Sequence, residues 1–534
     1  MIDISREIRH FPPGAPGPEP VHVGLVYPNT YQVALASLGF QTVHLIAHRT
    51  PGIVTHRIVL ENTRGDDYPT RTLEERLEIK SLDVLLVSCS FELDYLHFVR
   101  MLHAAGIPPI RRRRGNLPLV IVGGIAPTAN PEPLAPFADA IVIGEAEMVL
   151  ERMLDDLLDS WPRISGSRFT RGRDELYESW DRIPGVYVPA LWEDEKGGFS
   201  DRGGKRIKQA FVPDIETHLS YTPILSPNGV YGSKNLVEIS RGCPTHCRFC
   251  LISHISPAGA KRTRSMASVL ENATIYPPVI ASVGLVSSAV SDHPHIVPIL
   301  DSLAEDGYQV SVSSLKIPTT SRELFHSLAG AGTKSVTFAP EHGSEKIRQL
   351  VCKPNTYEEI RARIEWSFDA GISRIKLYFI TGFEEEDETD IQATPEFIMS
   401  LARDLHLSSR PAGGGFTIGL APFVPKASTP FQRRPMDDEV TLKRKMKTIL
   451  DPLRKQSRIE LEMESPRESL AQGALAMGDR GLVGHIMEIA KSRGPIIRAW
   501  EEAIIRLGDQ PRQTALRPKK QGEKLPWRFI IRPK

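Results

Sequence analysis

The chain has 534 residues, of which 41% are hydrophobic and 25% charged, a composition typical of soluble globular proteins. It carries 66 basic and 65 acidic residues, and the net charge of +1 excludes a general attraction to nucleic acid. No apolar segment is long enough to span a bilayer, and the N-terminus lacks the core of a signal peptide. We therefore expect a cytoplasmic protein of about two to four domains with no membrane partner.

The first 160 residues alternate between short apolar segments and helical patterns. Four apolar segments are predicted strands: 22–28, 83–88, 119–124 and 140–145. Helical patterns follow three of them, at 31–49, 94–105 and 146–158. This alternation predicts an α/β domain with a doubly wound, Rossmann-like parallel sheet, in which ligands bind at the carboxyl ends of the strands. Those ends carry residues 27–31, 88–91, 123–130 and 144–147.

The remaining residues divide into three parts. Residues 161–232 lose this periodicity and are predicted to link two domains. Strands and helices alternate again over 233–432, with strands predicted at 236–240, 282–287, 309–313, 335–338, 374–379 and 417–421. Residues 433–534 are predicted to form a small, mostly helical region with a basic tail. In the first domain, the four arginines at 111–114 are interpreted as a solvated loop.

Three of the five cysteines, Cys243, Cys247 and Cys250, lie just after the strand at 236–240, with the spacing C-x3-C-x2-C. Three thiolates this close can bind a cubane cluster and leave one iron open, as a reaction centre requires. Half of a zinc site is the alternative, but zinc sites usually show a second cysteine or histidine pair, and Cys89 and Cys352 are isolated. A disulfide set does not suit a chain of this size without a signal peptide.

The loop at 241–250 resembles the cluster loop of the radical S-adenosylmethionine (SAM) superfamily, down to Phe249, the aromatic residue before the third cysteine. The resemblance implies a [4Fe-4S] cluster on the three cysteines, SAM on the open iron, and contact between the backbone of Phe249 and the adenine. It also implies a partial (β/α)6 TIM barrel, in agreement with the predicted strands. An external donor such as flavodoxin or ferredoxin would reduce the cluster, and one electron would cleave SAM to methionine and a 5'-deoxyadenosyl radical.

Such an enzyme must hold SAM with polar side chains at the strand tips. The candidates are Ser288 and Asp292 after the second strand, Ser313 after the third, Glu341 after the fourth and Lys376 on the fifth. Most radical SAM barrels carry Gly-Gly-Glu near the second tip, where this chain has Ser-Ser-Ala-Val-Ser-Asp. An alternative role for Glu341 is equally favoured: its negative charge would stabilise the N-terminus of the helix that follows it. Lys376 needs an anion, for which the SAM carboxylate or Glu341 would serve.

The first domain resembles the cobalamin (B12)-binding-like domain that precedes the barrel in many radical SAM enzymes. The resemblance implies contacts to cobalamin at four residues of this chain. Gly123, Gly124, Gly144 and Glu145 correspond to positions that, in such domains, contact the corrin ring or its nucleotide tail. The chain has no Asp-x-His-x-x-Gly motif, so a bound cobalamin would lack a histidine on its lower face. The alternative is a sheet that kept its shape and lost its ligand, since paired glycines also serve tight turns.

The resemblance to one bacterial subfamily with this domain order runs nearly end to end. Its segments are 28–31, 130–134, 337–341, 376–379, 478–480 and 525–527. The favoured function is cobalamin-dependent C-methylation of an unknown substrate, which is a small molecule, a peptide or RNA. The second is a cobalamin-independent radical SAM enzyme whose front domain recognises RNA or a ribosomal partner. The third is a non-catalytic metal-binding partner protein, against which the open three-cysteine site argues. The basic tail lacks interleaved aromatic residues, so we favour docking over RNA contact for it.

Overall fold

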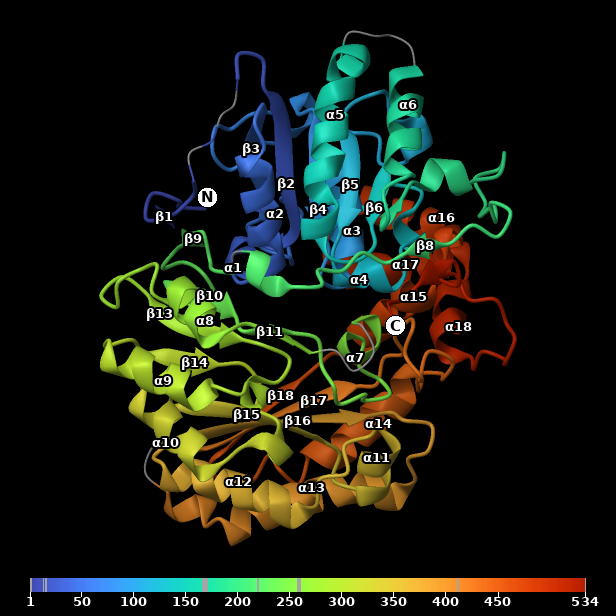
Figure 1. The fold of residues 1–534 in the computed structure, drawn as a ribbon. Coiled ribbons are helices and arrows are strands. Elements are labelled where there is room, and N and C mark those ends of the chain that lie inside the picture. The colour runs from blue at the N-terminus through green and yellow to red at the C-terminus, as the bar shows by residue number, and fades with distance from the viewer. Residues whose placement is uncertain are drawn as a thin grey trace.

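The computed structural model describes residues 2–12, 14, 17–165, 171–218, 220–256, 261–410 and 413–533. Figure 1 shows a front domain, coloured blue to cyan, above a half-barrel coloured green to orange. The red C-terminal helices lie against the front domain, and the C-terminus lies between the two bodies. No helix among the described residues combines the length and apolar character needed to cross a bilayer.

The front domain is the predicted doubly wound sheet. Its strands are β2 (Val21–Thr30), β3 (Ile53–Leu60), β4 (Val84–Ser88), β5 (Leu119–Gly123), β6 (Ala140–Val142) and β7 (Val186–Tyr187). They lie in the order β3-β2-β4-β5-β6-β7, and only β7 is antiparallel to its neighbour. The direction in which strands are added reverses between β2 and β4, and such a switch point is where ligands bind in these sheets.

Helices cover both faces of the front sheet. Three of them, α2 (Leu38–Arg49), α5 (Leu150–Ser165) and α6 (Arg171–Trp180), cover one face, and α3 (Asp94–Ala104) lies on the other. Alternate side chains of β4 enter the two cores, with Leu85 and Val87 on the α3 side and Leu86 on the opposite side. Because α6 and β7 join this domain, the sheet extends past the expected boundary at residue 160.

Sequence reasoning did not predict β3, because His56 and Arg57 interrupt its apolar run. Arg57 is nevertheless only 1% exposed. Its guanidinium pairs with Glu7 at 2.7 Å and with Glu74 at 2.6 Å. The prediction of a solvated arginine loop holds for Arg112 and Arg113, which are exposed. It was wrong for Arg111 and Arg114, which are buried and pair with Glu193 and Asp139. Buried guanidinium groups of this kind require such partners.

The second body is an open parallel barrel, as predicted. Its strands are β10 (Lys234–Glu238), β13 (Ser282–Val286), β14 (Val310–Val312), β15 (Ser335–Glu341), β16 (Arg374–Thr381), β17 (Gly415–Pro422) and β18 (Ile459–Met463). The first three and the last four form separate ladders, which the Leu315 N–H joins by a 2.9 Å hydrogen bond to the Thr337 carbonyl. Between the strands lie α8 (Met266–Ala273), α9 (Ile296–Glu305), α10 (Arg322–Gly330), α12 (Tyr357–Asp369), α13 (Glu388–Asp404) and α14 (Glu439–Leu450). The seventh strand, β18, lies within the region that was expected to be mostly helical.

The rest of the C-terminal region completes the core of the front domain. It consists of α15 (Pro466–Met477), α16 (Val483–Lys491), α17 (Ile496–Leu507) and α18 (Gln510–Leu516). Ile486 and Trp500 share one hydrophobic cluster with Leu96 of α3. The tail ends in β19 (Ile530–Ile531), which pairs in parallel with β8 (Ile207–Lys208) of the interdomain segment. The tail therefore docks on the body of the protein.

Candidate active site

The cysteine loop follows β10 at the carboxyl end of the barrel. A short antiparallel pair, β11 (Ser240–Arg241) with β12 (Arg262–Thr263), fixes its base, and α7 (Ile252–Ile255) follows it. The barrel holds the middle of the loop from the opposite side. The Arg248 N–H donates to the Val351 carbonyl at 3.3 Å, and the Arg248 carbonyl accepts from the Phe431 N–H at 3.1 Å. The loop is thus anchored at both its base and its middle.

The three thiols differ in burial. Cys247 is buried, and Cys243 and Cys250 are partly exposed. Burial raises the pKa of Cys247 to about 12, so as a free thiol it stays protonated, and iron would supply the positive charge that its thiolate lacks. Among the described residues, no three His, Cys, Asp or Glu side chains lie close enough to share one metal ion. A cubane is held differently from a single ion, because each of its three thiolates binds a different iron.

Two predicted residues, Phe249 and Ser288, lie at the loop itself. Phe249 packs on an apolar cluster that includes Phe383, with ring centroids 6.5 Å apart. The hydroxyl of Ser288 donates a 2.5 Å hydrogen bond to the carbonyl of Gly242, the residue before Cys243. The tip of the second barrel strand therefore touches the base of the cluster loop.

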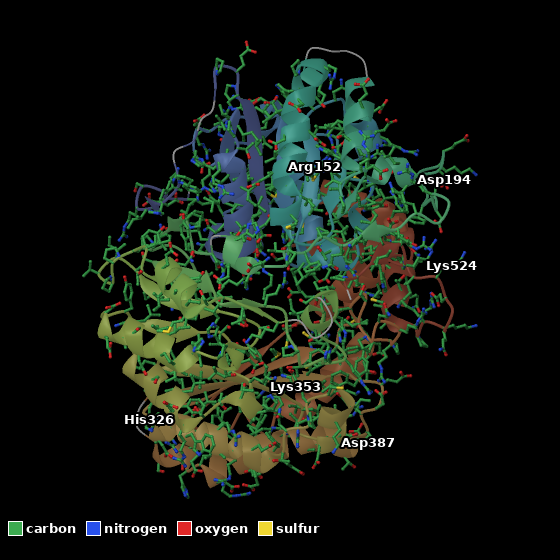
Figure 2. All side chains as sticks on the ribbon, viewed as in Figure 1. Arg152, Asp194, His326, Lys353, Asp387 and Lys524 are labelled. Carbon is green, nitrogen blue, oxygen red and sulfur yellow. The ribbon has the colours of Figure 1, made fainter. Side chains whose placement is uncertain are left out.

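Glu341 lies beside the cysteines, where it is buried and forms an ion pair with the partly exposed Lys353 that sequence reasoning missed. Its carboxylate is 2.9 Å from the ammonium of Lys353, which also donates to the carbonyl of Ala339 at 3.2 Å. Lys353, labelled in Figure 2, interacts electrostatically with Cys247 and Cys250. Although burial lowers the pKa of Lys353, the neighbouring carboxylate of Glu341 raises it above its usual value, so the ammonium stays charged.

The other predicted SAM contacts have partners within the protein. Ser313 donates to the Ser287 carbonyl at 2.6 Å, and Asp292 pairs with Lys316 at 3.2 Å. Lys376 pairs with Glu462 of β18 at 2.6 Å and not with Glu341, which was one of the two anions expected for it beside the SAM carboxylate. The reason is that the unpredicted strand β18 lies beside β17 and brings Glu462 to the same face as Lys376.

The structure gives a packing reason for two of the predicted front-domain glycines. Gly124 has φ +119°, and a Cβ there would overlap the Cys89 carbonyl. Gly144 has φ +120°, and a Cβ there would overlap the Ala210 carbonyl. Only glycine adopts such conformations without strain. Gly123 differs, because its φ is ordinary and a Cβ would lie 3.7 Å from the Cβ of Val142.

The carboxyl ends of the front strands face the cluster loop, and ion pairs cross between them. Arg241, two residues before Cys243, reaches Glu147 at 2.9 Å and Glu145 at 3.2 Å. Glu145 also pairs with Arg262 at 2.7 Å. Burial raises the pKa of Glu145, but the guanidinium groups of Arg262 and Arg241 bring it below its usual value. The predicted residue Glu145 is therefore a link between the two bodies.

The switch point between β2 and β4 carries polar and aromatic side chains. Asn29 donates to the buried carboxyl of Asp94 at 3.1 Å, and burial raises the pKa of Asp94 to about 7. Phe91, three residues beyond β4, is 40% exposed. Beside it, Glu92 pairs with Lys426 from the exit of the sixth barrel strand at 2.7 Å. This part of the sheet edge therefore also faces the barrel.

Comparison with protein-family models identifies two segments. The model for the radical SAM superfamily matches residues 237–398, which hold the cysteine loop and the first barrel strands, and a model for the N-terminal part of radical SAM proteins matches residues 39–189. The chain belongs to the radical SAM superfamily. An uncharacterized protein of Methanocaldococcus jannaschii is 27% identical over 481 residues, covering 90% of this chain and 94% of that protein. An uncharacterized methyltransferase of Pyrococcus horikoshii is 22% identical over 300 residues, covering 53% of this chain and 58% of that protein.

Two solved radical SAM enzymes share the fold across both bodies. The methyltransferase TsrM from Kitasatospora setae, with cobalamin and a [4Fe-4S] cluster bound, has a TM-score of 0.56 and 15% identity, covering 91% of this chain and 100% of that one. The cobalamin-dependent enzyme OxsB, with aqua-cobalamin and SAM bound, has a TM-score of 0.50 and 14% identity, covering 93% of this chain and 72% of that one. At these identities the likeness concerns the fold alone.

Membership in the radical SAM superfamily implies a [4Fe-4S] cluster and SAM as cofactors, and the observed loop fits both. Its three thiols lie on one anchored turn at the carboxyl end of a parallel barrel, where ligands of such barrels gather. The charged pair of Glu341 and Lys353 beside the turn carries a carboxylate and an ammonium, which complement the amino and carboxylate groups of an amino acid.

Proposed function

We propose that this radical SAM enzyme transfers a methyl group to an unknown substrate, with cobalamin held between the front sheet and the cluster loop. The observation that supports the proposal most is the orientation of the front sheet, whose carboxyl ends face the loop and contact it through Arg241, Glu145 and Glu147. When bound, the cluster and SAM supply a radical, and cobalamin supplies the methyl group. A ligand at the switch point would then lie between the sheet and the reaction centre.

The sheet edge has features that suit a corrin ring. The exposed ring of Phe91 offers apolar surface, and Asn29 and Ser90 offer hydrogen-bonding groups for the amide arms of the corrin. No histidine occurs in residues 27–31, 88–94, 123–130 or 144–147. A cobalamin at this edge would therefore have no histidine from it on the lower face.

Within the barrel we assign three roles to the chain's own residues. Cys243, Cys247 and Cys250 bind the cluster, and Glu341 with Lys353 orients the amino-acid end of SAM. Lys376 and Tyr378, which is 39% exposed, lie on alternate positions of β16 and offer the substrate a charged and an aromatic contact. Gly419 of β17 leaves room for the ring of Tyr378, because a Cβ there would lie only 2.7 Å from it.

A second candidate is a radical SAM enzyme that works without cobalamin and uses the front domain for recognition. The packing at Gly124 and Gly144 favours it. At both glycines the space that a Cβ would fill is occupied by a backbone carbonyl of the chain, and not left for a ligand. Glu92 supports it as well, because Lys426 and Gln472 already bind this carboxylate at the sheet edge.

Metal analysis distinguishes the two candidates. The chain is expressed with a cobalamin supply, purified anaerobically, and assayed for iron, sulfide and cobalt. Methyl transfer predicts cobalt in about equal amount to the chain, and Phe91→Ser should lower cobalt while leaving iron unchanged. Tyr231→Ser, which alters another exposed aromatic residue, serves as the control and should keep both metals. A full iron content without cobalt, even after reconstitution, would exclude the methylation proposal and favour the recognition module.

A further inference from the structure

The C-terminal tail forms a cavity on the outer side of the cluster loop. The cavity has a volume of about 450 Å³, and its walls come from the tail and from the segment after the sixth barrel strand. The residues that line it are Ser428, Gln432, Arg433, Glu523, Lys524, Leu525, Trp527, Arg528, Ile530 and Arg532. Figure 1 shows the C-terminus beside α7, the helix that follows the cysteines.

The apolar lining of this cavity packs directly on the cluster loop. Leu525 and Trp527 form a hydrophobic cluster with Ala427, and Leu251, the residue after Cys250, packs against that cluster. The indole N–H of Trp527 donates to the side-chain carbonyl of Gln432 at 2.8 Å, which fixes the ring. The tail side chains therefore pack against the residue that follows the last cluster ligand.

The rim of the cavity is positively charged. Lys524 and Arg528 line the cavity, and Lys520 adjoins it through its carbonyl, which accepts from Arg433. All three side chains are exposed, and within the described part of the chain no carboxylate pairs with them. Figure 2 shows Lys524 at the right-hand edge of the molecule, pointing outward. The rim's acidic residue, Glu523, is paired with Arg517 at 2.5 Å. This local charge contrasts with the net charge of +1 of the whole chain.

Arg532 adds a positive charge at the base of the cavity. Its guanidinium donates to neutral oxygens only: the carbonyls of Thr128 and Ala129, the hydroxyl of Ser428 and the side chain of Gln209. No carboxylate of the described residues lies within pairing distance of it. Arg532 is partly buried, and because no carboxylate neutralises it, its guanidinium adds to the positive potential of this surface.

We propose that this tail surface, called here the basic rim (Lys520, Lys524 and Arg528), docks a small acidic one-electron carrier protein that reduces the cluster. This inference rests on the proposed radical SAM function, which requires an outside source of electrons. The carrier loses one electron and the cluster gains one, so the step needs no further reactant. Opposite charge steers such encounters and orients them. The tail, which packs on Leu251, then brings the carrier close to Cys250.

The same rim suits RNA less well. Proteins that bind single strands combine positive charge with aromatic rings on which bases stack. The aromatic side chains of the tail, Trp527 and Phe529, are 5% and 1% exposed and lie in the protein interior. The ring of Phe199, which is partly exposed, is covered by the guanidinium groups of Arg528 and Arg480. The tail itself therefore offers charge without exposed stacking surfaces.

The test compares carrier-driven and chemical reduction of the full-length, cluster-loaded protein. Reduced bacterial flavodoxin is mixed with the protein without SAM, and the loss of the cluster's visible absorption is followed. Lys524→Glu with Arg528→Glu should slow this reduction by at least about tenfold at low salt, since rim charges act mainly on association. Reduction by dithionite should be unchanged. Lys524→Gln with Arg528→Gln should give a smaller effect, and high salt should abolish the difference.

Lys334→Glu with Lys455→Glu is the matched control. Both lysines are exposed and precede β15 and β18, at the opposite end of the barrel. This control should be reduced by flavodoxin at the wild-type rate. Equal rates of cluster reduction by flavodoxin for the rim variant and the wild type would overturn the docking proposal. A rim variant that loses RNA binding but is reduced at the wild-type rate would overturn it as well. Failure of dithionite-reduced wild type to cleave SAM would instead contradict the proposed function.

Discussion

At the scale of single residues, the cysteines of the chain have distinct expected roles. Cys250→Ala should abolish iron and sulfide incorporation after anaerobic reconstitution, because a cubane held by two thiolates loses one of its anchors. Cys352→Ala is the control, since Cys352 lies next to Lys353 near the loop but outside the three-cysteine motif. It should keep a full cluster, as measured by iron, sulfide and the visible spectrum. Equal iron loss in both variants would contradict the ligand assignment.

Asp94 is expected to make stability depend on pH. Its pKa is raised to about 7 from the usual value of an aspartate, about 4, because burial outweighs the hydrogen bonds from Asn29 and the backbone. The folded state therefore favours the protonated carboxyl, and stability falls as the pH rises from about 4 to 7, by up to about 4 kcal/mol at about 1.4 kcal/mol per pKa unit. Asp94→Asn removes this titration. Between about pH 4 and pH 7 the wild type should lose stability relative to the variant, as measured by the free energy of unfolding of both proteins. A difference that stays constant over this range would contradict the raised pKa of Asp94.

The sequence was sufficient to find the cluster loop because its three ligands and Phe249 are neighbours in the chain. The pair of Glu341 and Lys353 was only half predicted, since the two residues belong to different elements that the fold brings together. The carboxylate partner of Lys376 was misassigned because Glu462 lies on a strand that was not recognised. Contacts within a motif can be read from spacing, whereas contacts between elements depend on strand order.

At the scale of elements, two adjacent glycines separate backbone packing from ligand contact. Gly124→Ala should destabilise the front domain by more than about 3 kcal/mol, because the alanine would be strained at φ +119° and would meet the Cys89 carbonyl. Gly123→Ala should change stability by less than about 1 kcal/mol, since its nearest neighbour lies at ordinary contact distance. Chemical denaturation measures both.

The same pair also tests cofactor contact. A cobalt content that falls in a stably folded Gly123→Ala variant would indicate that cobalamin approaches the backbone there. If Gly124→Ala and Gly123→Ala were equally stable, the contact between residue 124 and the Cys89 carbonyl would not require glycine.

Strand prediction succeeded where apolar runs were continuous and failed where charge interrupted them. The strands β4, β5 and β13 are nearly all apolar and were found. The strand β3 contains Arg57, and β18 alternates glutamates with apolar residues. In β18, Ile459 and Leu461 pack on the barrel core, so Glu460 and Glu462 project from the other face. A strand of an open barrel that carries polar side chains on one face therefore lacks the continuous apolar run by which strands are predicted.

At the scale of the whole molecule, the chain closes on itself. The C-terminal helices were predicted, but not that they pack on the front domain and share its core. Arg480 illustrates this closure, since its guanidinium pairs with the buried Glu132 of the front domain at 2.8 Å. Together with Arg241 and Lys426, which pair with front-domain carboxylates, this contact holds the front sheet over the cluster loop. Sequence periodicity contains no information on such long-range docking.

The most direct test of the central claim is reductive cleavage of SAM. The reconstituted protein is incubated anaerobically with SAM and dithionite, and 5'-deoxyadenosine is quantified by chromatography and mass spectrometry. We predict its formation by the wild type and by Cys352→Ala, and its absence with Cys250→Ala. A fully loaded and reduced cluster that leaves SAM intact would contradict the assignment of this chain as a radical SAM enzyme.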